Sequence, residues 1–290
     1  MNESGAIRFH YLLRAVILLL FALYIGHLVQ QEALHYYVAP KLARWIRLCP
    51  VPLALMALSL GIQALFGKSS ALCDCEHRLP GSMFRSSALY GLFLLPMLLG
   101  FLLPDRALGS AAAAKKGIAL TYNLSEQESK ENFTAANPYE AEFAELAARL
   151  HAEPVITVHP EIYSETFGAI DLYKKQFEGK EIAVTGFLYR EGTSAGKASY
   201  AVSRFLVQCC TADATPFGIL LNPAAQISLP ADTWIEVRGK LEIVTHEGRE
   251  LIGITPETLT PVPQPSTPYV YTSADSITAW EQLQNAGAVK

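Results

Sequence analysis

The stretch Tyr11–Val29, YLLRAVILLLFALYIGHLV, has one arginine and one histidine in 19 residues and is otherwise almost wholly apolar. Two similar runs follow, Leu48–Phe66 (LCPVPLALMALSLGIQALF) and Ser86–Leu103 (SSALYGLFLLPMLLGFLL), and neither carries a charge. Each run would form a helix of about 27–29 Å, the thickness of the hydrocarbon layer of a bilayer. The sequence therefore predicts three transmembrane helices, with the lipid bilayer as a partner of the chain.

The first run also has an alternative interpretation, as a cleaved signal peptide. The residues that follow it, Gln30–Ala33, contain no convincing small-x-small cleavage site, and the run is long for a signal. We therefore favour a retained helix. Basic residues are nearly balanced on the two sides, so the positive-inside rule decides little. With Arg8 before the first helix and three spans after it, we expect a multi-pass cell-membrane protein whose C-terminal domain is extracytoplasmic.

The apolar runs account for the composition of the whole chain. Of its 290 residues, 51% are hydrophobic and 17% are charged, whereas about 25% charged is usual for soluble domains. Residues 1–110 contain nine Lys/Arg and five Asp/Glu, and the rest contains fourteen and twenty-two. Binding to the nucleic-acid backbone needs a basic surface, so we expect no nucleic-acid partner. Five cysteines are too few for a disulfide scaffold.

The pattern divides the chain into four parts. Residues 1–105 form the three-helix membrane anchor, 106–137 a linker, 138–272 a soluble domain that begins with short helices, and 273–290 a C-terminal tail. Asn137 can cap a helix whose first residue is Pro138. Ser164 can cap a second helix, and the hydrophobic period changes to two after it ends at Gly179.

Alternating apolar residues predict five strands, of which two contain an internal glycine, Gly186 or Gly239, where a strand can bulge or bend. The strands are Glu181–Tyr189, Tyr200–Cys210, Phe217–Leu221, Trp234–Val244 and Leu251–Leu259. This order favours a five-stranded antiparallel β-barrel like the oligonucleotide/oligosaccharide-binding (OB) fold; a β-sandwich is the alternative. The predicted fold class is thus a membrane α-helical part followed by a soluble β part.

A candidate metal site lies in the loop between the second and third apolar runs. Cys73, Cys75 and His77 stand there with two carboxylates, and thiols and imidazoles are the donors that zinc prefers. The C-x-C-x-H spacing is tight, and a tetrahedral site would need a fourth ligand from elsewhere. The alternative is a solvated polar loop with incidental cysteines.

A second cysteine pair, Cys209–Cys210, stands at the end of the second predicted barrel strand. Adjacent residues of a regular strand point to opposite faces, so both sulfurs meet one metal only if the strand bulges or ends there. A vicinal disulfide is another way to join them. The simplest alternative places one cysteine in the core and the other on the surface.

Several stretches of the chain resemble the YcgQ-like family of bacterial membrane proteins. They are Lys116-Gly117, Gly179-Lys180, Val184–Tyr189, Ser203-Arg204-Phe205, Cys209-Cys210-x-Ala212-Asp213-Ala214-x-Pro216 and Gly218. The resemblance implies a permease subunit that pairs with a separate multi-span permease of the YcgR-like type, with a link to zinc supply. It also marks Cys209, Cys210, Asp213 and Arg204 as a motif whose role is not assigned.

The middle loop departs from the family pattern. It looks His-rich in many relatives, whereas here it retains Cys73, Cys75 and His77, enough for one compact site. The resemblance and the three predicted spans favour an accessory subunit of a two-component permease, whose barrel binds a small solute such as a metal ion. A thiol-based redox- or metal-responsive envelope protein is the alternative.

No general acid–base constellation or phosphate loop is visible, so we expect neither an enzyme nor a firmly bound cofactor. Zinc is the metal that the thiols would suit.

Overall fold

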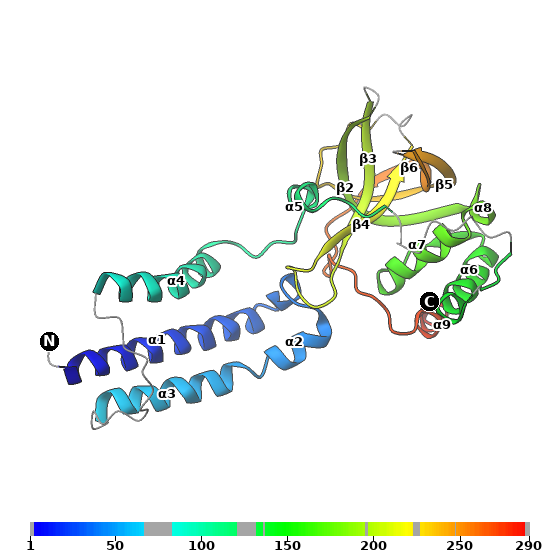
Figure 1. Cartoon of the computed structure of the whole chain (residues 1–290). Helices are drawn as coiled ribbons and strands as arrows, with labels where there is room; N and C mark the ends of the chain where they lie inside the picture. The colour runs from blue at the N-terminus through cyan, green and yellow to red at the C-terminus, as the bar shows by residue number, and fades with distance from the viewer. Residues whose placement is uncertain are drawn as a thin grey trace. The chain divides into compact units, whose positions relative to one another are not determined.

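The computed structural model describes residues 3–66, 83–120, 132–135, 137–194, 197–222, 227–246 and 248–287. The chain divides into two compact units, Met1–Arg106 and Ala107–Lys290. Figure 1 shows the helices of the first unit in blue and cyan, and the strands of the second in green, yellow and orange. Each unit is described by itself.

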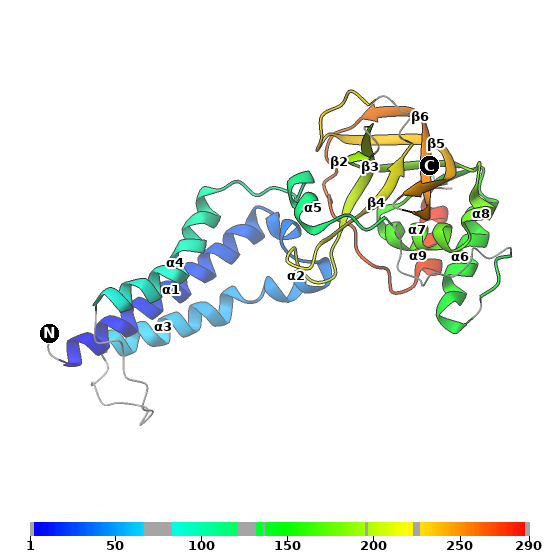
Figure 2. The same cartoon turned by 45° about the horizontal axis from the view of Figure 1, so that its top comes forward.

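The first unit is entirely helical in its described part. Its elements are α1 (Glu3–Gln30), the 3-10 helix η1 (Ala33–Tyr36), α2 (Pro40–Ile46), α3 (Pro50–Phe66) and α4 (Met83–Leu102). Figures 1 and 2 both show α1 alongside α3. All three apolar runs of the sequence are therefore helical, and Pro96 lies inside α4.

Two of the described helical segments are long and apolar enough to cross a membrane. They are Arg8–Gln30 and Pro40–Phe66, the second of which joins α2 to α3. The described apolar part of α4, Ala88–Leu102, is shorter. By length and composition, the structure thus gives two candidate spans at the N-terminus.

Several small side chains of these helices are buried, and many of their large apolar side chains are exposed. Ala15 and Ala22 on α1, and Ala57 and Ala64 on α3, are each exposed by 7% or less. The exposed large apolar residues include Leu12, Leu19, Leu23, Leu55, Leu58, Leu92, Leu95 and Leu98. Small residues at the helix contacts and large apolar ones outside are typical of helices packed in lipid.

The second unit begins with helices and continues with strands. Its helical elements are α5 (Ser110–Lys116), η2 (Pro138–Glu140), α6 (Ala141–Ala152), η3 (Pro160–Ile162), α7 (Tyr163–Leu172), α8 (Lys174–Phe177) and α9 (Ser276–Gly287). Asn137 caps as predicted, because its side-chain oxygen accepts the backbone N–H of Glu140 at 3.1 Å. The expectation that Ser164 caps the second helix was wrong: α7 begins at Tyr163 and includes Ser164, whose hydroxyl donates to the Glu165 carboxylate. The predicted helix is also divided in two at Tyr173.

Five strands close into a barrel. They are β2 (Glu181–Ser194), β3 (Lys197–Leu206), β4 (Thr215–Leu221), β5 (Trp234–His246) and β6 (Arg249–Pro261). Their order is β2-β3-β4-β6-β5, and β5 pairs with β2 to complete the ring. The β4–β6 contact is parallel and the other four are antiparallel. A short strand, β1 (Val155–Thr157), adds to β2 in parallel.

Gly239 allows β5 to bend against β6. The register between these strands shifts between Arg238 and Gly239. A Cβ atom at residue 239 would lie 2.1 Å from the carbonyl oxygen of Thr255, closer than real Cβ contacts allow. The glycine is therefore required by the close approach of the two backbones, as the internal position in the sequence pattern predicted.

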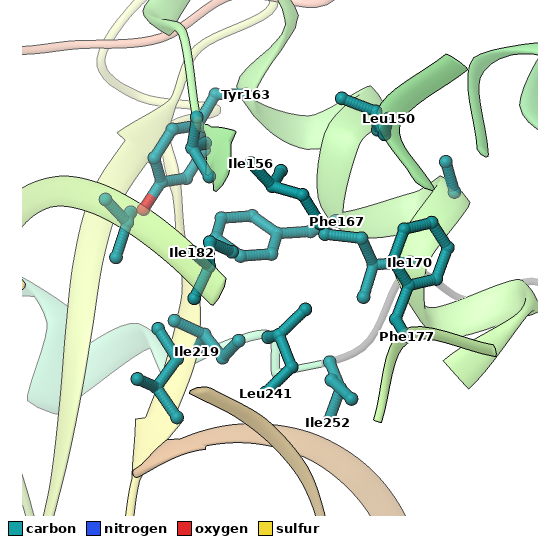
Figure 3. Close-up of a cluster of buried hydrophobic side chains, with 14 of the residues drawn as sticks. Leu150, Ile156, Tyr163, Phe167, Ile170, Phe177, Ile182, Ile219, Leu241 and Ile252 are labelled. Atoms are coloured by element: carbon teal, nitrogen blue, oxygen red, sulfur yellow. The ribbon is translucent and has the colours of Figure 1, made fainter. Parts of the chain in front are cut away.

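The barrel and the preceding helices share one core, shown in Figure 3. Phe167 and Ile170 from α7 lie with Ile182, Leu241 and residues of the other strands in this cluster. The ring of Phe167 lies 6.0 Å from that of Phe217 on β4, measured between centroids. Helix α7 thus covers part of the barrel interior and helps to fix the β4 end of the β3–β4 connection.

Two further segments pack onto the outside of the barrel. Residue Ala119 bridges to Phe217 of β4, and Ala113 of α5 is completely buried. Near the other end of the chain, the amide of Val270 donates to Phe205 at 2.9 Å. The segment that follows the first unit in the sequence and the segment that follows β6 both contact the β3–β4 hairpin.

Candidate functional site

The cysteine pair lies in the turn that connects β3 to β4, not within a strand. Strand β3 ends at Leu206, which pairs with Thr215 at the start of β4. We call residues 207–214 between them the cysteine turn. The expectation that a single strand runs from Tyr200 to Cys210 was wrong at its C-terminal end. Beyond Leu206, the amide of Val207 donates to the carbonyl oxygen of Val270 at 3.0 Å, in the segment that follows β6.

The carboxylate of Asp213 organises the cysteine turn from within. Its Oδ1 accepts the backbone N–H of Gln208 at 2.9 Å. Its Oδ2 accepts the N–H groups of Cys209 at 2.8 Å and Cys210 at 3.1 Å. Three consecutive amides therefore point at one carboxylate, an arrangement that fixes the backbone on which both cysteines stand.

Lys116 holds the same turn from outside. Its ammonium donates to the carbonyl oxygens of Thr211 at 3.4 Å, Ala212 at 3.0 Å and Ala214 at 2.6 Å. Lys116 is the last residue of α5, and Gly117 ends that helix with a positive φ of 75°. A charged donor therefore satisfies carbonyls that the turn leaves outside the β ladder.

The two thiols lie side by side on this support. Their sulfur atoms are 3.7 Å apart, so the pair is a dithiol in this structure. Cys209 is exposed and Cys210 is half-buried. The simple alternative of one buried and one surface cysteine is therefore wrong, because the strand has ended before the pair begins.

The electrostatics of the turn keep Asp213 charged and Cys209 protonated in the absence of a further ligand. The hydrogen bond from the Cys209 thiol, together with the backbone N–H groups, lowers the pKa of Asp213 to about 2. The hydrogen bonds to Asp213 and Cys210 raise the pKa of Cys209 to about 11. Negative charge on the carboxylate disfavours a thiolate beside it.

One ligand atom from each of Cys209, Cys210 and Asp213 lies within 4.8 Å of the others. Three such atoms on one face of a turn can converge on a single cation. Among the described residues, this is the group of Cys, His, Asp and Glu that could hold a metal ion. The structure thus brings together three of the four motif residues that the sequence marked.

Arg204, the fourth motif residue, performs a different task. It lies on β3 and is 1% exposed, and its Nε and Nη2 donate to the carbonyl oxygens of Pro268 and Thr267. Its guanidinium also lies over the ring of Trp234, 5.4 Å from the centroid. Burial lowers the pKa of Arg204 from its usual value. These contacts fasten the segment that follows β6, at residues 267–268, to the barrel.

The other candidate metal residues, Cys73, Cys75 and His77, lie outside the described residues. The sequence did mark Lys116 within the Lys116-Gly117 step, but no spacing indicated that it contacts a turn about a hundred positions later. That contact depends on the docking of α5 onto the barrel. No local sequence signal could have identified it.

A second polar feature, which the sequence did not indicate, is a hollow of about 320 Å³ at the other ends of β3 and β4. Glu242 on its wall has a buried Oε1 without a hydrogen-bond partner among the described residues. The hollow is lined by Ser199, Leu220, Leu221, Asn222, Glu242, Ile243, Val244, Thr245 and His246.

Comparison with known proteins gives two family matches and two curated relatives. The DUF1980 N-terminal domain matches residues 13–119, and the DUF1980 C-terminal domain matches residues 133–272. The "UPF0703 protein YcgQ" of Bacillus subtilis is 23% identical over 198 residues, which cover 63% of this chain and 68% of the relative. No solved structure gives a significant match.

The second relative has a functional description in its name. It is the "Putative two-component membrane permease complex subunit" of Streptococcus mutans, 24% identical over 196 residues. The matched region covers 61% of this chain and 70% of that protein. The two DUF1980 matches together span both the helical unit and the barrel unit.

Proposed function

The chain belongs to the YcgQ-like family, with both the N-terminal and C-terminal DUF1980 domains, and on this premise we propose that it is the accessory subunit of a two-component membrane permease. The observation that carries this proposal is the name of the Streptococcus mutans relative, which describes a subunit of such a complex. The apolar N-terminal helices support it, because they supply the membrane anchor that a permease subunit needs.

We propose that all three long helices, α1, α3 and α4, span the membrane. Their outward leucines and inward alanines support this, since lipid covers large apolar side chains and small residues let helices approach closely. Three helices are too few to enclose a pathway for a solute. The transport route would therefore belong to a multi-span partner of the YcgR-like type, against which these helices pack.

An odd number of spans places the two ends of the chain on opposite sides of the membrane. We propose that the N-terminus, with Arg8, is cytoplasmic, and that the barrel is extracytoplasmic. The loop that carries Cys73, Cys75 and His77 would then face the reducing cytoplasm, where free thiols persist. Protease access to tags at each terminus tests this: digestion of the C-terminal tag only from the cytoplasmic side contradicts it.

For the barrel we propose an OB-like fold. Strands β2, β3 and β4 form a meander, and the chain then crosses over so that β6 lies between β4 and β5. This Greek-key order, with β5 closing on β2, is the connectivity that OB barrels use. OB-like barrels bind ligands on one side wall and its loops, which supports a role in receiving a solute rather than in catalysis. We accordingly propose a binding subunit and not an enzyme.

One observation favours the second candidate function, a thiol-based redox- or metal-responsive envelope protein. The thiols of Cys209 and Cys210 are 3.7 Å apart at an accessible turn. A small movement would join them, and a cation between them would hold them apart. Intact function of a Cys209→Ser/Cys210→Ser variant, with the fold preserved, would contradict this candidate.

The main proposal is tested by affinity purification of the tagged full chain from its own host in mild detergent. Quantitative mass spectrometry should find one multi-span membrane protein enriched at a level comparable to the tagged chain. The matched control is the same purification from cells that express the untagged chain. Absence of any multi-span protein above that control, together with unchanged cellular metal content after deletion, would contradict the proposal.

A further inference from the structure

The cysteine turn has its backbone polar groups engaged by the protein itself. Three amides point at Asp213, and three carbonyls receive the ammonium of Lys116. The amide of Asp213 also closes the turn by donating to the carbonyl of Cys210 at 3.0 Å. The groups left for a ligand are the two thiols and the Asp213 carboxylate beside them.

The separation of the sulfurs fits a metal ion. In a tetrahedral site with metal–sulfur bonds of about 2.3 Å, two thiolates lie about 3.8 Å apart. The observed distance between the Cys209 and Cys210 sulfurs is 3.7 Å. A disulfide requires about 2.0 Å, so the two thiols are not bonded to each other, and their separation matches that of two ligands of one cation.

The carboxylate of Asp213 has room for a further interaction. Among the described contacts, its Oδ1 accepts one backbone N–H, and a carboxylate oxygen offers two acceptor sites. The ligand atoms of the three residues already lie within 4.8 Å of one another. Two sulfurs and one oxygen are therefore close enough to converge on one cation through small movements of their side chains.

We propose that Cys209, Cys210 and Asp213 form a three-ligand site for a thiophilic metal ion, held ready by Lys116. This inference rests on the proposed function, because it names the class of solute that the barrel would receive. Two sulfurs select soft or borderline cations such as Zn²⁺ over Mg²⁺ and Ca²⁺. The fourth tetrahedral position stays open, as it does in sites that exchange a ligand.

Lys116 connects helix α5 to the cysteine turn that carries the proposed site. Its helix, α5, is the first element after the helical unit in the sequence, and its ammonium binds the carbonyl side of the cysteine turn. Residues that orient metal ligands cost about 10–100-fold in metal affinity when they are removed. Lys116 is therefore a positioning residue, because it orients the backbone that carries the two thiols.

The test measures Cd²⁺ and Zn²⁺ binding to the reduced full chain in detergent. The background carries Cys73→Ser, Cys75→Ser and His77→Ala, which removes the other candidate ligands. Equilibrium dialysis should give one metal equivalent, with ultraviolet cadmium–thiolate absorption. Adding Cys209→Ser/Cys210→Ser should weaken binding at least about 100-fold, because losing two ligands costs more than losing an orienting residue. Lys116→Met should weaken it about 10–100-fold.

The matched control is Cys49→Ser, since Cys49 is a free cysteine of the helical unit; it should bind as the background does. Unchanged circular dichroism and tryptophan fluorescence would show that the double variant is folded. Equal binding by background and double variant, or no binding by the reduced background, overturns the inference. Metal binding without any co-purified permease supports the site and contradicts the permease role, so the two failures are distinguishable.

Discussion

The ammonium of Lys116 lies 2.6 Å from the carbonyl oxygen of Ala214, a contact that joins residues 98 positions apart. It links the segment that leaves the helical unit to the turn that carries both accessible thiols of the barrel. A lysine in this position donates hydrogen bonds to carbonyl oxygens that have no partner in the β ladder. The cysteine turn is therefore stabilised by a residue outside the barrel strands.

Replacing Lys116 by Met should loosen the cysteine turn. Three carbonyls lose a charged donor, and hydrogen bonds to charged groups contribute about 1.5–3 kcal/mol. We expect faster amide exchange at Asp213 and Ala214, and faster alkylation of Cys209. Lys115→Met is the matched control, because Lys115 is the exposed neighbour in the same helix. Equal exchange rates in the two variants would contradict the role of Lys116.

Replacing Arg204 by Met should release the segment 267–270, which follows β6, from β3. The guanidinium is buried and donates to two carbonyls of this segment, so its loss should cost about 1–3 kcal/mol in the free energy of unfolding. The amide of Val270 should lose its protection in hydrogen exchange. Arg238→Met is the control, since Arg238 forms an exposed ion pair with Glu236 whose loss costs at most about 1 kcal/mol. A protected Val270 amide in the Arg204 variant would refute this assignment.

Asp171 should make the barrel unit less stable at neutral pH than at acid pH. Burial raises its pKa to about 6 from 3.8, and its Oδ1 has no hydrogen-bond partner among the described residues. The folded chain then holds a proton that the unfolded chain releases, so stability falls as pH rises from about 4 to about 6. Asp171→Asn should remove this fall and stabilise the chain at pH 7, by up to about 3 kcal/mol.

Thermal unfolding followed by tryptophan fluorescence, measured from pH 4 to pH 7, tests the effect of Asp171. Asp275 provides the contrast, because hydrogen bonds from Thr278 lower its pKa. Its stabilising contribution is present above the unfolded pKa and is lost as the pH falls. A pH profile that is identical in the wild type and in Asp171→Asn would show that Asp171 ionises normally in the folded chain.

Gly239→Ala should destabilise the barrel. The new Cβ would meet the backbone oxygen of Thr255, which cannot move without breaking the β5–β6 pairing. Overpacking of this kind costs about 1–3 kcal/mol. Gly253→Ala is the matched control in the same hairpin, because its Cβ would meet side-chain methyl groups of Val244 at 3.0 and 3.1 Å. The lowering of Tm should be larger for Gly239→Ala, and the reverse order would contradict the bulge at this position.

Patterns local in sequence predicted most of the fold. The apolar runs gave the three helices, the Asn137–Pro138 step gave a helix start, and alternation gave the five strands in their correct order. The exact residues at which the strands end were less predictable than the strands themselves. Near the end of β3 at Leu206, Val270, more than sixty residues away, exchanges hydrogen bonds with Phe205 and Val207 on the edge of β3 opposite β4.

The candidate site was predictable in composition but not in geometry. Cys209, Cys210 and Asp213 stand close together in the sequence, so their proximity required little inference. Their convergence required the strand to end before the pair, which no spacing in the sequence indicated. The contacts of Arg204 and the hydrogen bonds of Lys116 to the cysteine turn depend on the docking of distant segments. The spacing of residues within a single helix or strand does not predict such contacts.

Site-specific photo-crosslinking in intact cells tests the central claim most directly. A photoreactive residue is placed at exposed apolar positions of α1, α3 and α4, such as Leu19, Leu58 and Leu95, with buried Ala22 as the control. The permease account predicts that one helix face crosslinks to a multi-span membrane protein, while Ala22 crosslinks only within the chain. Crosslinks to lipid or to a second copy of this chain at every exposed position would contradict it.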